Sequence, residues 1–174
     1  MEIILVAVGV LMIYYIFQNF SKSLKTNKKF LYGYEEITNE ILHVQIDKEG
    51  TKEYDFSFKY NNTNYVFKVL KCPNNGEIVI NNKTRWQINL DMRVGKAPRN
   101  KVEVKDLDGF MNYDVENTVR YCLVYKDCYS IKQWVNECEM KFIKTNKDLV
   151  YGIKFLKFDE FETLVKENKE NANK

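Results

Sequence analysis

Residues 53–72 read EYDFSFKYNNTNYVFKVLKC and decide the fold of this chain. From Tyr54 to Tyr60, aromatic residues alternate with polar ones, which is the period of a β-strand with one buried face. Asn61-Asn62 favours a tight turn, and residues 65–72 form a second, largely apolar run. The stretch therefore predicts a β-hairpin.

The segments on either side of the hairpin predict an α/β fold. Residues 28–47 place apolar side chains at the spacing of one helical face, at Phe30, Tyr34, Ile37, Ile41 and Val44. Downstream, the pattern predicts a third strand or a second hairpin over 78–90 that turns at Asn81-Asn82, a basic loop over 91–105, a short helix over 107–117, a buried strand over 120–125, a helix from Ser130 to about Lys144, a strand over 151–158 and a helical turn over 159–165. The order α-β-β-β-α-β-α-β is typical of one mixed-sheet α/β sandwich.

The N-terminus predicts a membrane anchor. Residues 3–20 carry no charged side chain and would form about 27 Å of helix, just enough to cross a bilayer core. Aromatic residues crowd the end of this run, and Lys22, Lys25, Lys28 and Lys29 follow it, where they can contact lipid headgroups. A buried N-terminal helix is the alternative.

Because the positive charge lies only after the apolar run, the positive-inside rule places the N-terminus outside and the rest in the cytoplasm. We therefore expect four parts: a transmembrane helix over 1–20, a basic juxtamembrane stalk over 21–29, a cytoplasmic α/β domain over 30–165 and a disordered tail over 166–174.

Composition excludes several classes of protein. The 174 residues are 45% hydrophobic and 29% charged, with only 7 Gly and 2 Pro, which excludes a disordered chain. The net charge of +3 belongs to the N-terminal flank, because residues 35–174 hold 23 basic and 23 acidic side chains. A neutral body does not favour nucleic acid as the partner.

Four cysteines, Cys72, Cys122, Cys128 and Cys138, have no spacing typical of zinc or redox motifs. We expect thiols, as in a reducing cytoplasm; two disulfides are the alternative if the orientation is reversed.

Phosphate-binding and nucleophile-elbow motifs are absent, and the single histidine, His43, leaves no histidine-based triad. The order of elements nevertheless resembles the restriction-endonuclease-like superfamily. The resemblance rests on two strands: Glu53-Tyr54-Asp55-Phe56 opens the first, and Tyr65 to Lys71 forms the second. The resemblance implies a nuclease that holds Mg or Mn with Asp55 and the helix carboxylate Glu40, with Lys68 or Lys71 positioning water. The family's Glu-x-Lys reads Lys68-Val69-Leu70 or Val69-Leu70-Lys71 here, so one metal-binding carboxylate is missing. An ordinary hairpin with an Asp55–Lys68 ion pair is the alternative.

A second group of candidates is basic and has Trp86 nearby in the sequence. It comprises Arg85, Arg93, Lys96, Arg99, Lys101 and Lys105, which would contact phosphates of nucleic acid or lipid, or be solvated.

These observations predict a single-pass, membrane-anchored binding or scaffold module with no cofactor, whose partners are the lipid bilayer and an unidentified protein. The alternatives are a membrane-tethered, metal-dependent or catalytically decayed nuclease, and a basic loop that docks on anionic lipid.

Overall fold

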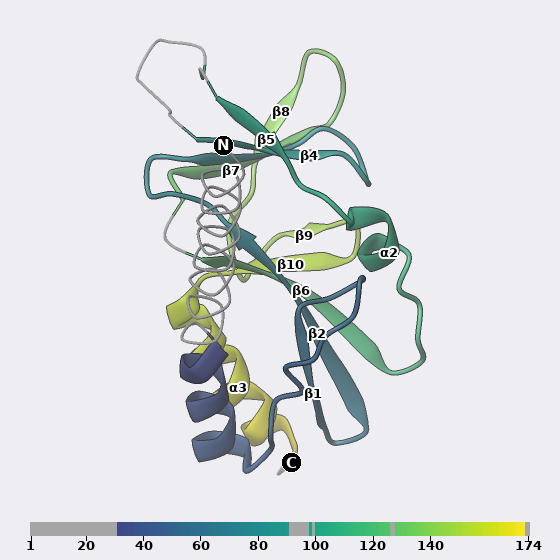
Figure 1. Cartoon of the computed structure of the whole chain (residues 1–174), viewed down its shortest axis with the longest axis vertical. Helices are drawn as coiled ribbons and strands as arrows, with labels where there is room; N and C mark the ends of the chain where they lie inside the picture. Colours follow the sequence, from purple (N-terminus) through teal and green to yellow (C-terminus); the bar gives the residue numbers. More distant parts are fainter. Residues whose placement is uncertain (1–30, 91–97, 99, 126–127, 173–174) are drawn as a thin grey trace, which may run out of the picture.

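The computed structural model describes residues 31–90, 98, 100–125 and 128–172, with the side chains of 171–172 excepted (Figure 1). Residues 31–42 form a helix, called here the leading helix. The other elements are β1 (Phe56–Tyr60), β2 (Thr63–Lys71), β3 (Glu77–Ile80), β4 (Trp86–Asn89), β5 (Lys101–Glu103), α2 (Leu107–Met111), β6 (Thr118–Tyr125), β7 (Ser130–Trp134), β8 (Met140–Phe142), β9 (Leu149–Val150), β10 (Ile153–Leu156) and α3 (Phe158–Ala172).

The strands form two mixed sheets of five strands each. Sheet A has the order β1-β2-β6-β10-β9, in which β2, β6 and β10 are parallel and the two outer pairs are antiparallel. Sheet B has the order β5-β4-β3-β7-β8, and only its β3–β7 pair is parallel. The mixed α/β class is therefore confirmed, whereas the expectation of one mixed sheet is wrong.

The hairpin of residues 53–72 is confirmed. β1 and β2 pair antiparallel from Phe56 with Phe67 to Tyr60 with Thr63. The two turn residues, Asn61 and Asn62, have φ of 47° and 62°, which a two-residue turn of the I′ type requires and Asn tolerates. The local pattern sufficed here because turn and strands are adjacent in sequence.

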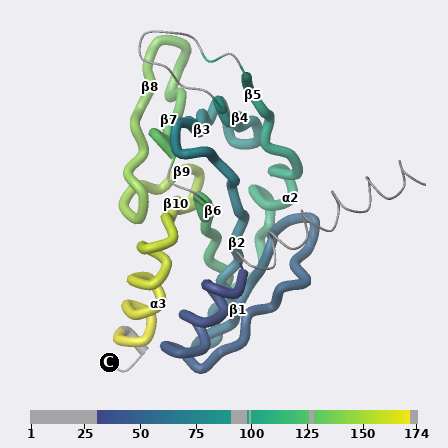
Figure 2. The backbone as a smooth tube through the Cα atoms, turned by 60° about the vertical axis from the view of Figure 1, so that its left-hand side comes forward, coloured from purple at the N-terminus to yellow at the C-terminus, as the bar shows by residue number. Residues whose placement is uncertain are grey.

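Sheet A separates two hydrophobic cores (Figures 1 and 2). On one face the leading helix and α3 lie side by side and cover an aromatic cluster, in which Tyr34 packs on Phe161 with ring centroids 4.7 Å apart. On the other face, residues such as Val66 and Cys122 pack with Trp86 of sheet B and Phe110 of α2. Period-two alternation along β2 and β6 sends neighbouring residues to different cores.

The largest correction concerns residues 130–144, which form β7 and β8 and not a helix. Ile131, Trp134, Val135 and Cys138 have helical spacing, but Asn136 turns the chain: its Oδ1 accepts the backbone N–H groups of Cys138 and Glu139. β7 then pairs with β3, far away in sequence. This tertiary pairing overrides the local periodicity, and it takes residues 78–80 and 130–134 into a second sheet.

The C-terminal end differs from the expected disordered tail. α3 runs to Ala172, because Phe161, Leu164 and Val165 are buried on the aromatic core and anchor it, and Lys166 pairs with Glu162 at 2.7 Å. The tail expectation is therefore wrong for residues 166–172.

The expected anchor over 1–20 and stalk over 21–29 lie outside the described residues. Within the described ranges, no helix is long and apolar enough to cross a membrane.

Candidate functional site

Asp55, the central residue of the nuclease resemblance, holds the hairpin together. Its Oδ2 accepts the backbone N–H of Val69 at 2.6 Å, and its own N–H donates to Phe67 O at 2.8 Å. The carboxylate thus extends the β1–β2 ladder at its open end. This position gives Asp55 a structural role.

Lys68 lies on the face of sheet A that looks toward sheet B. It stands between Val66 and Leu70 of that core and is opposite Cys122 in the β2–β6 register. Its positive charge helps to lower the pKa of the Glu53 carboxyl, after the larger effect of a hydrogen bond with Thr51. Glu53 is an acidic neighbour of Lys68 that the sequence analysis did not select.

Arg120 also lies near Cys122. Its Nη1 donates to the carbonyls of Phe110 (3.2 Å) and Met111 (2.6 Å), which end α2. Burial is the main cause that raises the pKa of the Cys122 thiol, and the thiol is fully buried. The hydrogen bonds of Arg120, on β6, therefore fasten the end of α2 to sheet A.

The remaining residues of the motif do not complete a metal site. Glu40 is exposed on the leading helix, which covers the aromatic face of sheet A, whereas Lys68 faces the other core. Lys71 is exposed at the end of β2, opposite Tyr125. Across the described part of the chain, no three Cys, His, Asp or Glu side chains gather as a metal site would need. The pairing of Glu40 with Asp55 as ligands thus has no geometric support.

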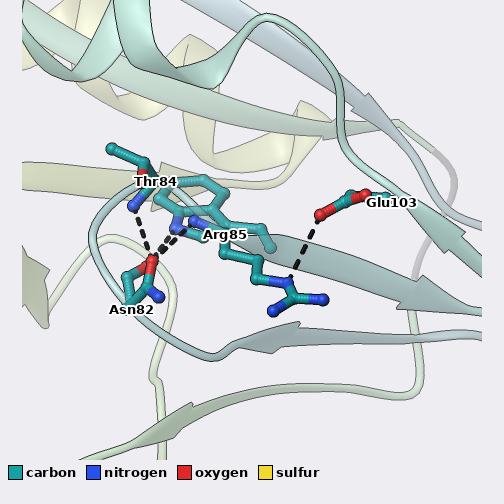
Figure 3. Close-up of polar contacts among 5 residues, drawn as sticks. Asn82, Thr84, Arg85 and Glu103 are labelled. Atoms are coloured by element: carbon teal, nitrogen blue, oxygen red, sulfur yellow. Dashed lines mark hydrogen bonds and ion pairs between the residues drawn. The ribbon is translucent and has the colours of Figure 1, made fainter.

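The described basic candidates lie at the β4–β5 edge of sheet B. Figure 3 shows Arg85, whose Nε lies 3.4 Å from Glu103 Oε1 in a pair that is about 70% exposed on both sides. The turn before it is built by Asn82, whose Oδ1 accepts the N–H groups of Thr84 and Arg85 (Figure 3). This confirms the second hairpin. Lys101 is exposed on β5, and Lys105 is also exposed.

Trp86 is buried, so it cannot stack on a nucleic-acid base. Its ring packs on Phe155 and its Nε1 donates to Asn82 O at 3.0 Å. The other basic candidates lie outside the described residues: Lys22, Lys25, Lys28, Lys29, Arg93, Lys96 and Arg99.

The most distinctive surface lies on the β7–β8 hairpin, which sequence reasoning placed in a helix. In the register, Trp134 is opposite Met140 and Lys132 is opposite Phe142, so these four side chains share the outer face of sheet B. Trp134 and Met140 are each 38% exposed and Phe142 is 60% exposed. We call Trp134, Met140 and Phe142 the edge patch.

The backbone of β8 is also available at the edge patch. Ile143 N donates to Ile131 O, and Val135 N donates to Glu139 O. Residues 131, 133 and 135 therefore form the hydrogen-bonded pairs of this ladder, with residues 143, 141 and 139 respectively. In an antiparallel ladder, the residues between those pairs direct N–H and C=O away from the partner strand. Met140 and Phe142 therefore direct both groups to the outer edge, and β8 is the last strand of sheet B among the described residues.

A buried polar cluster around Glu77 holds the edge patch in place through Lys132. Glu77, which is 4% exposed, accepts hydrogen bonds from Ser130 Oγ (2.6 Å) and Asn89 Nδ2 (3.3 Å) and pairs with Lys132 Nζ (2.6 Å). The Lys132 ammonium lies 5.0 Å from the Phe142 ring centroid, which is cation–π distance. Ser130 thus donates its proton to a carboxylate that Lys132 neutralises, and these contacts hold the side chains of the cluster in position.

One signal in the sequence could have identified this hairpin. Asn136 lies between two runs that each contain a large apolar residue and a lysine, as a turn residue between two short strands does.

No protein-family model matches the chain, and no curated protein or solved structure is significantly similar to it.

Proposed function

We propose that this chain is a membrane-anchored binding module that takes up an extended segment of a partner protein along β8. The observation that carries this proposal is the coincidence at Met140 and Phe142 of outward backbone groups with exposed apolar side chains. Added strands gain affinity from main-chain hydrogen bonds and specificity from alternate side chains.

The side chains around β8 indicate the chemistry of the partner segment. A strand beside β8 would place alternate side chains on the edge patch, where apolar groups fit, and the intervening ones beside Lys141 on the other face of the hairpin. The ammonium of Lys141 lies 3.6 Å from Asp148, and its side chain remains 52% exposed. The partner segment therefore carries apolar residues at alternate positions, on one face, and an acidic residue at the position between them, on the other face.

Two other occupants fit less well. A second copy paired symmetrically about Lys141 would place two lysines directly opposite each other, which destabilises a strand pair. A lipid bilayer is disfavoured because the hairpin tip carries Glu137 and Glu139, both exposed.

The test places a photo-crosslinking phenylalanine derivative at Met140 in the full chain, expressed in its source cells. We expect a protein adduct, attached through an extended apolar segment, that is absent when the same residue replaces Leu149, which is 62% exposed on sheet A. A second substitution, Phe142→Pro, removes an outward N–H and should abolish the adduct, whereas Phe142→Ala should only weaken it. A lipid adduct, an adduct to a second copy, or equal labelling from position 149 would overturn the proposal.

The anchor over residues 1–20 has its own test. We expect the full chain to stay with membranes after alkaline extraction and a chain lacking residues 1–20 to be released. Protease added from the cytoplasmic side should digest the β7–β8 hairpin, whereas protection from that side would reverse the proposed orientation.

A further inference from the structure

Cys72 and Cys128 come together at the junction of the two sheets. Cys72 follows β2, and its N–H donates to Tyr125 O at 3.1 Å, while Tyr129 N–H donates to Gly76 O at 2.7 Å. These two bonds bring the chain after β2 beside the chain before β7. Cys128 packs against the core cluster that contains Cys72, and the two thiols share a hydrogen bond.

The two thiols differ in access. Cys72 is 2% exposed, and a Cβ added to Gly76 would lie only 2.7 Å from the Cys72 Sγ, so the turn over 73–76 closes directly on this sulfur. Cys128 is half-buried and lines an open cavity of about 410 Å³. A reagent from solution therefore reaches Cys128 first.

The cavity beside Cys128 is basic. Among the described residues, Lys144, Lys147 and Lys157 line it, together with one acidic residue, Glu160. The Glu160 carboxylate already accepts Thr145 Oγ1 at 2.7 Å and the backbone N–H of Lys157 at 2.8 Å. The cavity thus favours small anions over small cations.

The chemistry of Cys72 agrees with this order of reaction. The hydrogen bond with Cys128, followed by burial, raises the pKa of the Cys72 thiol well above its usual range. Cys72 therefore keeps its proton and reacts only with a sulfur already placed beside it.

We propose that Cys72 and Cys128 form a disulfide through exchange with a small anionic disulfide, such as oxidised glutathione, which enters the lysine-lined cavity. The Cys128 thiolate attacks one sulfur of the reagent, which forms a mixed disulfide and releases one thiolate. The Cys72 sulfur then attacks the Cys128 sulfur, and the second small thiolate leaves and takes up the proton that Cys72 gives up. The two protein thiols are oxidised and the reagent is reduced to two thiols.

This disulfide would join the end of β2 in sheet A to the segment that begins β7 in sheet B. Since it closes a loop of more than fifty residues, we expect oxidation to raise the thermal midpoint by several degrees. The β7–β8 hairpin would then be fixed to sheet A, independently of whether β8 binds a partner.

The experiment uses the full chain in detergent micelles with Cys138→Ser, which removes the exposed thiol. Incubation with oxidised glutathione should yield protein that has lost two hydrogen atoms and a cross-linked peptide pair containing residues 72 and 128. Cys72→Ser should stop the reaction at a stable glutathione adduct on Cys128. A persistent adduct on Cys128 in the parent protein, a cross-link to Cys122, or no oxidation of folded protein would overturn the proposal.

A second arm tests the cavity. At low salt, oxidised glutathione should react with Cys128 several-fold faster than cystamine, a cationic disulfide, relative to their rates with a free thiol in solution. Lys147→Gln should reduce that preference, and high salt should remove it. Equal relative rates at low salt would refute the role of the lysines.

Discussion

The Asp55 carboxylate accepts the backbone N–H of Val69 at 2.6 Å and so continues the β1–β2 ladder beyond Phe56. A residue that resembles a nuclease metal ligand in sequence is thereby committed to holding its own hairpin. Lys68 lies beside Asp55, but the salt bridges between described residues do not include this pair. The Asp55 carboxylate is bound to the Val69 N–H instead.

Asp55→Ala should lower the free energy of unfolding by about 1 kcal/mol, because the Val69 N–H loses a charged acceptor at a solvent-accessible position. Chemical denaturation of the full chain in detergent measures this. Asp47→Ala is the control, since among the described residues the Asp47 carboxylate accepts one local hydrogen bond, from Glu49 N at 3.0 Å, and its loss should matter less. Addition of Mn²⁺ should leave the thermal midpoint unchanged; a rise of several degrees that Asp55→Ala removes would restore the metal-site hypothesis.

Proline substitutions in β8 should distinguish its two edges. Lys141→Pro removes an N–H from the ladder with β7 and should cost about 1 to 3 kcal/mol of stability. Phe142→Pro removes an outward N–H and should cost clearly less, because proline is tolerated at the free edge of a sheet. Thermal unfolding of both variants decides this, and equal losses would show that β8 has a different register.

Alkaline pH should destabilise the aromatic core. Burial, with a smaller effect of Tyr65, raises the pKa of Tyr121 to about 12 from 10.0. The protonated phenol therefore contributes stability that is complete below pH 10 and is lost as pH rises toward 12, by about 2 kcal/mol. Tyr121→Phe should reduce the slope of the stability profile over this window without abolishing it, because burial also raises the pKa of Tyr34. Tyr151→Phe, at an exposed residue, should leave the profile unchanged, and a similar slope in all three proteins would contradict the assignment.

The accuracy of the sequence analysis followed the range of the interactions involved. The β1–β2 hairpin, β6 and β10 were predicted correctly because alternation and adjacent turn residues specify them. β7 was missed because its pairing with β3 joins Glu77 to Ser130 across the chain, and no local pattern encodes that contact. The division into two sheets depends on the same pairing.

The edge patch could not be predicted for a related reason. Whether Met140 and Phe142 direct their backbone to solvent depends on which strand is last in sheet B and on a register that begins at Asn136. Conversely, Lys68 lies on β2 as expected and Asp55 lies directly before β1, but the hydrogen bond from Val69 N–H to the Asp55 carboxylate depends on how the two strands pair, so the sequence did not reveal the structural role of Asp55.

The Glu77–Lys132 pair permits a double-substitution test of what positions the edge patch. Glu77→Leu leaves the Lys132 ammonium, whose side chain is 16% exposed, without its carboxylate and should cost about 3 to 5 kcal/mol. Lys132→Met should cost less, because Ser130 and Asn89 still hydrogen-bond the Glu77 carboxylate. The double variant should recover much of the loss from Glu77→Leu, since no buried charge is then unpaired.

Glu162→Gln is the matched exposed control, because it breaks a surface pair with Lys166 and should change stability by less than about 1 kcal/mol. Denaturant unfolding of the parent, the two single variants and the double variant gives the coupling energy between residues 77 and 132. Additive losses would mean that Lys132 gains nothing from Glu77, and the cation–π contact of Lys132 with Phe142 would then have to be maintained by other groups.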